Sequence, residues 1–334
     1  SAFGVRLGFE IESAPRGTAG ALRDALPRLG PQFLVLYGDT FVDVDLRRFW
    51  QAHERNEADA TLLLHPNDHP QDSDLVAVDR DGRVRELFAY PHPPGIHQRN
   101  LVNAALYAMK HEGLQSFAPA EGTADIAKHM FPAMLAAGRP LAGYVTPEYI
   151  KDAGTPERLD KVESDLASGV VERLSSRALR SAVFLDRDGT INQEVGHLRD
   201  PAQLALIDGA AEAIRRLNRE GRLAVVITNQ PVLARGDATE EQLDAIHARL
   251  EALLGEQGAY LDAIYVCPHH PDRGFAGEVA ALKIECTCRK PGTALIEQAC
   301  RDLAIDPSLS WFVGDTSSDM EAGRRAGLRT VLVS

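Results

Sequence analysis

The sequence predicts an α/β protein with two domains, the second of which contains a doubly wound parallel sheet. Short apolar runs alternate with amphipathic stretches along the second half of the chain, as parallel strands joined by helices do. Similar apolar runs occur in the first half, and 334 residues are more than one ordinary domain needs. Polar side chains directly follow several of these runs, which predicts a site at the strand ends.

The second half has five strand candidates, all short and rich in Val, Ile, Leu or Phe. They cover residues 182–187, 223–228, 263–267, 311–314 and 329–333. The clearest helix is predicted over 240–254, where leucine and isoleucine recur at helical spacing. Thr239 and Gln242 at its start match the pattern of a capping box.

The first half has strand candidates at 33–37, 60–64 and 104–109. Segment 156–180 is polar with weak helical periodicity and is interpreted as a helical connector. The predicted domains are therefore residues 1–159 and 181–334, joined by a connector over 160–180.

Composition excludes several classes of partner. The net charge of −12 argues against a nucleic acid held by phosphate contacts. No apolar run approaches the roughly 18 residues of a membrane helix, so no membrane partner is predicted. An acidic protein that takes a phosphorylated substrate must supply local cations, through bound metal or specific Lys and Arg residues.

The cysteine content suggests a cellular compartment, and the first residue suggests that a segment of the natural chain is missing. Four cysteines and no visible secretory signal favour the cytoplasm over an oxidising compartment. The chain begins with Ser1 and not Met, so we expect its natural start to be missing.

The run Asp186–Thr190 directly follows the apolar stretch Ala182–Leu185 and is the most informative motif. Residues i and i+2 of an extended strand point to the same side, so Asp186 and Asp188 are expected to converge on one reacting group or one metal. A solvated turn is the simplest alternative, because Asp and Gly are ordinary turn residues. A calcium loop with Gly189 at its sixth position would place Phe184 at the first ligand position, which excludes that reading.

Three further polar signals follow strand candidates or begin a helical stretch. Thr228 and Asn229 end an apolar run and could donate hydrogen bonds to phosphoryl oxygens. Lys290 precedes Pro291 and the helical stretch 292–303, so we expect it near a helix N-terminus, where anions are favoured. Asp315 follows the apolar run Trp311–Val313 and could join Asp186 in binding Mg²⁺.

In their order and placement these signals resemble the four motifs of the haloacid dehalogenase superfamily. The motifs fall on Asp186–Thr190, Thr228, Lys290 and Gly314–Asp319. The resemblance implies a Mg²⁺-dependent phosphotransferase of Rossmann-like fold, with Asp186 as nucleophile and Asp188 as acid and base. Thr228 and Lys290 complete the predicted catalytic set. The predicted Mg²⁺ ligands are Asp186, Asp188 and Asp315.

A cluster of thiols predicts a second metal site. Cys267, His269, Cys286 and Cys288 form two short pairs of soft or borderline ligands, which suits a closed tetrahedral Zn²⁺ site. Buried free thiols are the alternative. His270 and Cys300 are rival fourth ligands, and Cys300 is interpreted as a core residue.

The segments Cys267–Pro271 and Cys286–Pro291 resemble the D-glycero-D-manno-heptose-1,7-bisphosphate phosphatases and the related histidinol phosphatases. The resemblance implies a structural zinc loop that shapes the substrate entrance, with Arg289 directed at the second phosphate of the substrate. The implied substrate-binding residues are Gly189, Glu194, His197, Asn229 and Arg289.

Residues 1–159 resemble the sugar-1-phosphate nucleotidylyltransferases. The matching pieces are Glu12–Ala21, Leu36–Thr40, Asn103–Ala105 and Asp152–Pro156. The resemblance implies that Asp39 and Asp152 hold Mg²⁺, that Gly17 and Thr18 lie beside a nucleobase, and that Asn103 lies near the sugar. It also allows a homo-oligomer formed through this domain. The family's glycine-rich loop would precede Ser1, so the chain is expected to be a fragment of a bifunctional enzyme, with a degenerate scaffold domain as the alternative.

The leading hypothesis is a phosphatase that removes the 7-phosphate of a heptose bisphosphate in nucleotide-activated heptose synthesis. Histidinol-phosphate phosphatase is the nearest alternative. A nucleotidylyltransferase with an auxiliary phosphatase half is a second alternative, and a zinc-stabilised interaction module is the weakest.

Overall fold

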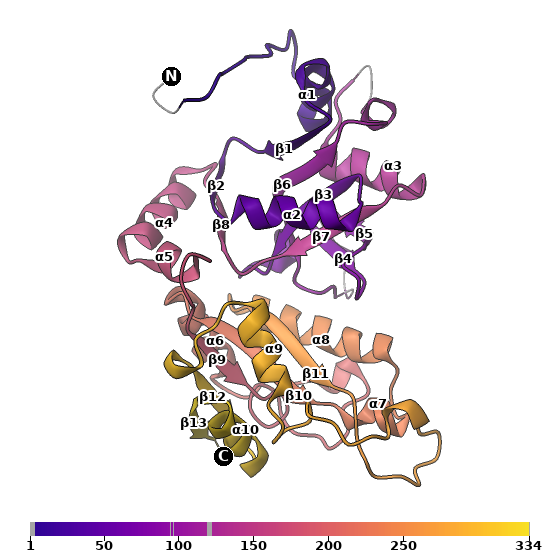
Figure 1. The fold of residues 1–334 in the computed structure, drawn as a ribbon, viewed down its shortest axis with the longest axis vertical. Helices are drawn as coiled ribbons and strands as arrows, with labels where there is room; N and C mark the ends of the chain where they lie inside the picture. Colours follow the sequence, from indigo (N-terminus) through magenta and orange to yellow (C-terminus); the bar gives the residue numbers. More distant parts are fainter. Residues whose placement is uncertain (1–3, 94, 96, 119–121, 334) are drawn as a thin grey trace.

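The computed structural model describes residues 4–93, 95, 97–118 and 122–333. Ser1 lies outside these residues. Figure 1 shows two α/β halves, the N-terminal one above the C-terminal one, each with its own main sheet. The predicted α/β class is confirmed in both halves. Among the described residues, no helix is both long and apolar enough to span a membrane.

The C-terminal half contains a five-stranded sheet in which every pair is parallel. Its spatial order is β11-β10-β9-β12-β13. The strands are β9 (Ala182–Leu185), β10 (Leu223–Asn229), β11 (Ala263–Cys267), β12 (Trp311–Gly314) and β13 (Arg329–Leu332). The predicted doubly wound parallel sheet is therefore confirmed, with the five strands within two residues of their expected limits.

Helices cover both faces of this sheet, because alternate residues of each central strand face opposite sides. The helices of this half are α6 (Ala210–Arg219), α7 (Pro231–Arg235), α8 (Glu240–Gly255), α9 (Ala294–Asp302) and α10 (Ser317–Arg325). Val183 and Leu185 pack with residues of α6 and α8. Ala182 and Phe184 pack on the other side, with residues of α9 and α10. Helix α8 begins with the predicted capping box at Thr239.

The N-terminal half is built on a six-stranded mixed sheet in the order β5-β4-β6-β3-β7, with β1 also paired to β6. Only β3 and β7 run parallel among the pairs described in this sheet. The strands are β1 (Gln32–Leu36), β3 (Ala60–His65), β4 (Leu75–Val78), β5 (Val84–Phe88), β6 (Val102–Lys110) and β7 (Leu141–Val145). A separate antiparallel ribbon joins β2 (Thr40–Asp43) and β8 (Tyr149–Asp152). The helices of this half are α1 (Gly17–Ala25), α2 (Leu46–Asn56) and α3 (Phe131–Ala136).

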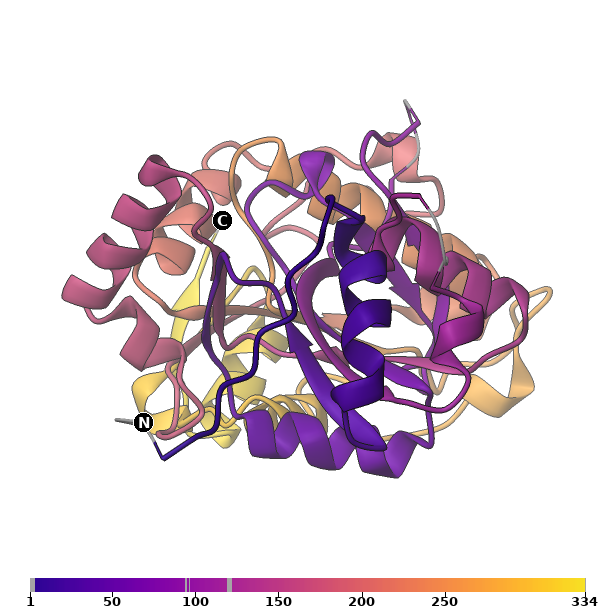
Figure 2. The ribbon, with the colours of Figure 1, turned by 90° about the horizontal axis from the view of Figure 1, so that it is seen from above.

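Two helices lead from one half to the other. They are α4 (Pro156–Ala167) and α5 (Val170–Leu174), which lie at one side of the molecule in Figures 1 and 2. The connector is therefore helical up to Leu174. Beyond it, buried Arg180 donates hydrogen bonds to the carbonyl oxygens of Leu174 (2.9 Å) and Leu303 (2.8 Å), which fixes the end of the connector to the C-terminal half.

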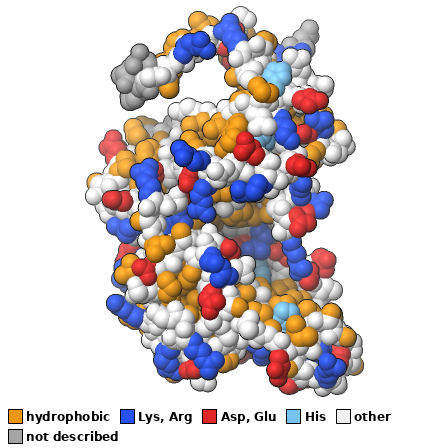
Figure 3. Space-filling model, in the orientation of Figure 1, with side chains coloured by type: hydrophobic (Ala, Val, Ile, Leu, Met, Phe, Trp, Pro, Cys, Tyr) orange, Lys and Arg blue, Asp and Glu red, His pale blue; other side chains and the backbone are white. Residues whose placement is uncertain are grey.

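Figure 3 shows acidic and basic side chains interspersed over the face in view. The net charge of −12 is therefore not gathered into one acidic patch on that face.

The structure corrects the predicted start of the helix after Lys290. Helix α9 begins at Ala294, with Thr293 at its N-cap, so Pro291 lies outside the first turn. Lys290 lies three residues before this N-cap, near the helix start but outside its first turn, so its chemistry is described by its side-chain contacts.

Candidate functional site

The predicted phosphotransfer residues meet at one edge of the C-terminal sheet. Because β9, β10 and β12 are parallel neighbours, their carboxyl ends lie together. Asp186 follows β9 and its backbone N–H donates to the Val313 carbonyl oxygen at 3.0 Å. A cavity of about 190 Å³ opens at this edge. Its lining includes Asp186, Asp188, Glu194, His197, Thr228, Asn229, Arg289 and Asp315.

Lys290 is buried between two carboxylates beside this cavity. Its Nζ lies 2.8 Å from Asp186 Oδ1 and 2.7 Å from Asp319 Oδ1, and the residue is only 4% exposed. Asn229 fixes the backbone at this point, since its Oδ1 accepts from the Lys290 N–H (3.0 Å) and its Nδ2 donates to the Lys290 carbonyl oxygen (3.3 Å). The amide of Asn229 therefore binds the lysine segment, and because Asn229 also lines the cavity its substrate contact stays a prediction.

Asp186, Asp315 and Asp319 form a group of carboxylates whose oxygens lie within 4.8 Å of one another. Burial raises the pKa of Asp186 to about 6, although the Lys290 ammonium opposes the shift. Burial also raises the pKa of Asp315. Asp315 Oδ1 is buried and accepts no hydrogen bond from the residues that the structure describes. Crowded carboxylates with an unsatisfied buried oxygen fit a hard divalent cation, which would favour their ionised form.

The side-chain oxygens of Asp188 do not belong to this carboxylate group, so its place among the Mg²⁺ ligands stays a prediction. Strand β9 ends at Leu185, so Asp188 lies in the turn beyond it and the alternation of an extended strand no longer applies. Its carboxylate accepts from Arg187 Nη2 (2.7 Å), Asn192 Nδ2 (2.9 Å) and Gln230 Nε2 (2.8 Å). These donors orient it toward the cavity that it lines with Asp186.

Thr228 is buried beneath the same cavity, and its hydroxyl accepts from Gln230 Nε2 at 2.9 Å. The same amide nitrogen donates to Asp188, so Gln230 ties the end of β10 to the turn after β9.

The residues predicted to bind substrate divide into two sets. Glu194, His197 and Arg289 line the cavity. Gly189 lies behind Asp315: it has φ +74°, and a Cβ built on it would be 2.1 Å from Asp315 Oδ2. The glycine therefore makes room for the Asp315 carboxylate, and its contact with substrate stays a prediction.

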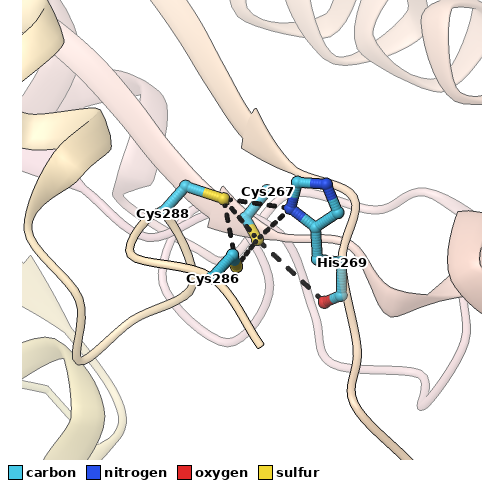
Figure 4. A group of neighbouring side chains, drawn as sticks. All are labelled: Cys267, His269, Cys286 and Cys288. Atoms are coloured by element: carbon cyan, nitrogen blue, oxygen red, sulfur yellow. Dashed lines mark hydrogen bonds between the residues drawn. The ribbon is translucent and has the colours of Figure 1, made fainter. Parts of the chain in front are cut away.

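The thiol cluster assembles as predicted around one point (Figure 4). Cys288 Sγ lies 3.2 Å from both Cys267 Sγ and Cys286 Sγ, and Cys267 Sγ lies 3.7 Å from Cys286 Sγ. His269 Nδ1 is 3.2 Å from Cys288 Sγ and 3.9 Å from Cys267 Sγ. Sulfurs bound tetrahedrally to one zinc ion at about 2.3 Å would be about 3.8 Å apart, which matches the Cys267–Cys286 separation, whereas the two distances from Cys288 are about 0.6 Å shorter.

The structure separates the rival ligands from this cluster. His270 Nδ1 accepts from the Asp272 N–H at 3.2 Å and is not in the group, and Cys300 lies on α9. All four cysteines are free thiols. Burial raises the pKa of the Cys267 thiol, so a bound metal would be needed to hold it as a thiolate.

Of the five nucleotidyltransferase-like residues predicted in the first half, three line one cavity and two do not. Asp39, Asn103 and Asp152 line a cavity of about 540 Å³. The pairing of β2 with β8 brings the two aspartates to either side of Gly154, whose Cβ would lie 3.2 Å from Asp39 Oδ2 and 3.0 Å from Asp152 Oδ1. Gly17 and Thr18 are absent from this lining, and the Thr18 hydroxyl donates to Asp125 Oδ2 at 2.8 Å.

Sequence reasoning assigned no role to three residues of the phosphotransfer site: Asp319, Gln230 and Arg187. Asp319 stands at the end of the fourth motif, and as the third residue of α10 it forms a capping box with the N-cap Thr316. Nothing in the sequence pattern distinguishes Arg187 from a solvated charge, yet its side chain is fully buried.

Comparisons with known proteins agree with both predicted resemblances. A family model described as nucleotidyl transferase matches residues 1–169, half of the chain, and a model described as HAD-hydrolase-like matches residues 287–334. A curated relative from Pasteurella multocida, named D-glycero-beta-D-manno-heptose-1,7-bisphosphate 7-phosphatase, is 41% identical over 156 residues, covering 46% of this chain and 82% of the relative. The protein of that name from Yersinia pestis is 42% identical over 149 residues, covering 45% and 77%.

Among solved structures, a D,D-heptose 1,7-bisphosphate phosphatase from B. bronchiseptica, complexed with magnesium and phosphate, is 33% identical. The match covers 46% of this chain and 79% of that chain, with a TM-score of 0.41. From the family model over its first half and the identity and coverage of its curated relatives, the chain belongs both to the nucleotidyl transferase family and to the HAD-like family of the heptose-bisphosphate 7-phosphatases.

Proposed function

We propose that the C-terminal half hydrolyses the 7-phosphate of D-glycero-D-manno-heptose 1,7-bisphosphate, in the synthesis of nucleotide-activated heptose. The observation that carries the phosphatase assignment is the buried Lys290 ammonium, 2.8 Å from Asp186 and beside a cavity that Asp186, Asp188 and Thr228 line. The choice of substrate is supported by relatives about 41% identical that carry this name.

In the proposed reaction an Asp186 oxygen attacks phosphorus in line, forming an aspartyl-phosphate as the bond from phosphorus to the C7 oxygen breaks. Asp188 donates its proton to the departing alkoxide. It then takes a proton from water, which attacks phosphorus, breaks the Asp186–phosphate bond and releases inorganic phosphate. Lys290 and the Thr228 hydroxyl interact with the transferring phosphoryl group, so that two anions can approach each other.

The two metal sites have separate proposed roles. Asp186, Asp315 and Asp319 would hold Mg²⁺, which supplies charge neutralisation and orients a phosphate oxygen. Cys267, His269, Cys286 and Cys288 would hold a structural Zn²⁺ that orders the loop carrying Arg289, which we assign to the second phosphate of the substrate. Arg289 Nη1 donates to the His269 carbonyl oxygen at 3.5 Å, which links this guanidinium to the cluster.

We place the domain boundary within the connector at 160–180, with domains over 1–159 and 181–334. The separate main sheets support this division. Free thiols grouped as metal ligands, without a disulfide among the described residues, support work in the reducing cytoplasm.

A second activity, nucleotide transfer to a heptose 1-phosphate in the N-terminal half, is supported by the paired Asp39 and Asp152 in the 540 Å³ cavity. This activity is tested by measuring the affinity of heptose 1-phosphate for the protein and for its Asp152→Asn variant. Equal binding by both would contradict this site.

The phosphatase proposal is tested by phosphate release from heptose 1,7-bisphosphate, histidinol phosphate and a generic sugar phosphate. We expect the heptose bisphosphate to be preferred and Asp186→Asn to abolish turnover while the fold is retained. Equal, slow rates on all three substrates would exclude a dedicated heptose enzyme, and normal turnover by a folded Asp186→Asn protein would exclude the nucleophile.

A further inference from the structure

Helix α8 of the phosphatase half is clamped by a loop of the N-terminal half. Arg99, just before β6, places Nε 2.8 Å from Glu251 Oε2 and Nη1 2.9 Å from Asp244 Oδ1, both on α8. The Asn100 N–H donates to the same Glu251 oxygen at 2.8 Å. The Glu251 side chain is 6% exposed. In Figure 1, α8 lies directly beneath the end of the N-terminal sheet formed by β4 and β5.

His247 lies one turn before Glu251 on α8, and residues four apart share a helix face. It is 4% exposed, and its Nε2 lies 3.3 Å from Arg187 Nη1. Because a guanidinium can only donate hydrogen bonds, His247 Nε2 must accept and the ring must be neutral. Burial, together with the charges of Arg187 and Arg99, lowers the pKa of His247 well below its ordinary value, which agrees with a neutral ring.

Arg187, which His247 holds in place, in turn binds Asp188, the proposed acid and base. Its side chain is fully buried and holds Asp188 through Nη2 at 2.7 and 2.9 Å and through Nε at 3.1 Å. A bidentate guanidinium–carboxylate pair fixes the plane as well as the position of the carboxylate. Without an acceptor at position 247, the buried Arg187 Nη1 would lose the hydrogen-bond partner that helps to fix the guanidinium.

We propose that the N-terminal half positions Asp188 for proton transfer through a relay of four side chains: Arg99, Glu251, His247 and Arg187. Arg99 and His247 are then positioning residues of the phosphatase. Arg99 contacts α8 from the N-terminal half, and His247 connects α8 to Arg187 in the turn after β9. The inference rests on the role of Asp188 in the proposed function.

The chain offers a matched control for the interdomain end of the relay. Arg80 in the N-terminal half pairs with Glu240, also on α8, but both side chains are solvent-exposed (77% and 53%), and Glu240 lies about two helical turns before His247. Such exposed pairs are worth about 0–1 kcal/mol. Arg80→Ala therefore removes an interdomain ion pair without touching the relay.

We expect Arg99→Ala to lower kcat about 10-fold and His247→Leu roughly 100-fold, with KM within about twofold, because displacements near 1 Å cost up to about 100-fold in rate. Arg80→Ala should leave both constants unchanged. His247→Gln keeps a neutral acceptor and should recover most of the loss, which a purely structural role would not predict. Circular dichroism and thermal unfolding establish that each variant is folded.

Three results would overturn the relay: wild-type kcat in folded Arg99→Ala, equal losses in Arg99→Ala and Arg80→Ala, or equal impairment by Leu and Gln at position 247. Turnover by the wild type and its loss in Asp186→Asn test the proposed function independently of the relay. Unfolding free energies give a second readout that needs no activity: Arg99→Ala and His247→Leu should be non-additive, and additivity in that cycle would refute the relay even in an inactive protein.

Discussion

Replacing Gly189 with alanine should disrupt the carboxylate group of the phosphatase site. Gly189 has φ +74°, and its new Cβ would lie 2.1 Å from Asp315 Oδ2, where the closest contacts real Cβ atoms make are about 3.0 Å. Asp315 would have to retreat by about 0.9 Å. Metal–ligand distances tolerate only about 0.2 Å, so the ion should bind poorly. We expect kcat/KM to fall roughly 100-fold at a fixed Mg²⁺ concentration.

The matched control is Gly327→Ala. Gly327 has φ +79°, and nothing lies within 4 Å of its built Cβ. Both variants should lose about 1–2 kcal/mol of folding free energy, because alanine is strained at positive φ. Only Gly189→Ala should need more Mg²⁺ for half-maximal phosphate release. If Gly189→Ala reached wild-type kcat at the wild-type Mg²⁺ requirement, the assignment of Asp315 to the metal site would be refuted.

Further predictions concern buried charge, the thiol cluster and pH. Lys290→Met should lower the free energy of unfolding by about 3–5 kcal/mol in EDTA, measured in urea, because it leaves two buried carboxylates without their cation; an unchanged midpoint would contradict the ion pairs. Cys286→Ser should release the metal found in the purified protein by elemental analysis, whereas Cys300→Ser should retain it; equal metal content in both would exclude the cluster. Burial raises the pKa of Asp262 from 3.8 to about 7, so the folded state resists ionisation and stability should fall as pH rises from about 4 to 7, by up to about 4 kcal/mol. Asp262→Asn should remove that part of the pH dependence, and an identical profile in wild type and variant would show that Asp262 ionises freely.

The sequence determined the strands of the phosphatase half because strands buried on both faces need uninterrupted apolar runs. Phe184 and Leu185 pack on opposite sides of the sheet, so the run before Asp186 could contain no polar residue. The same logic placed Asp186, Thr228 and Asp315 at one edge, since the ends of parallel strands coincide. The thiol cluster could also be predicted from the sequence, because few side chains other than Cys and His make a closed zinc site.

Only the tertiary structure decided the contacts that act across long sequence separations. Gln230 reaches Asp188 over 42 residues and His247 reaches Arg187 over 60, and no local periodicity records either pairing. The turn after β9 places the Asp188 side chain outside the carboxylate group, and α10 contributes Asp319 to that group. Local sequence sets which residues end a strand, whereas the packing of distant helices sets which side chains those residues meet.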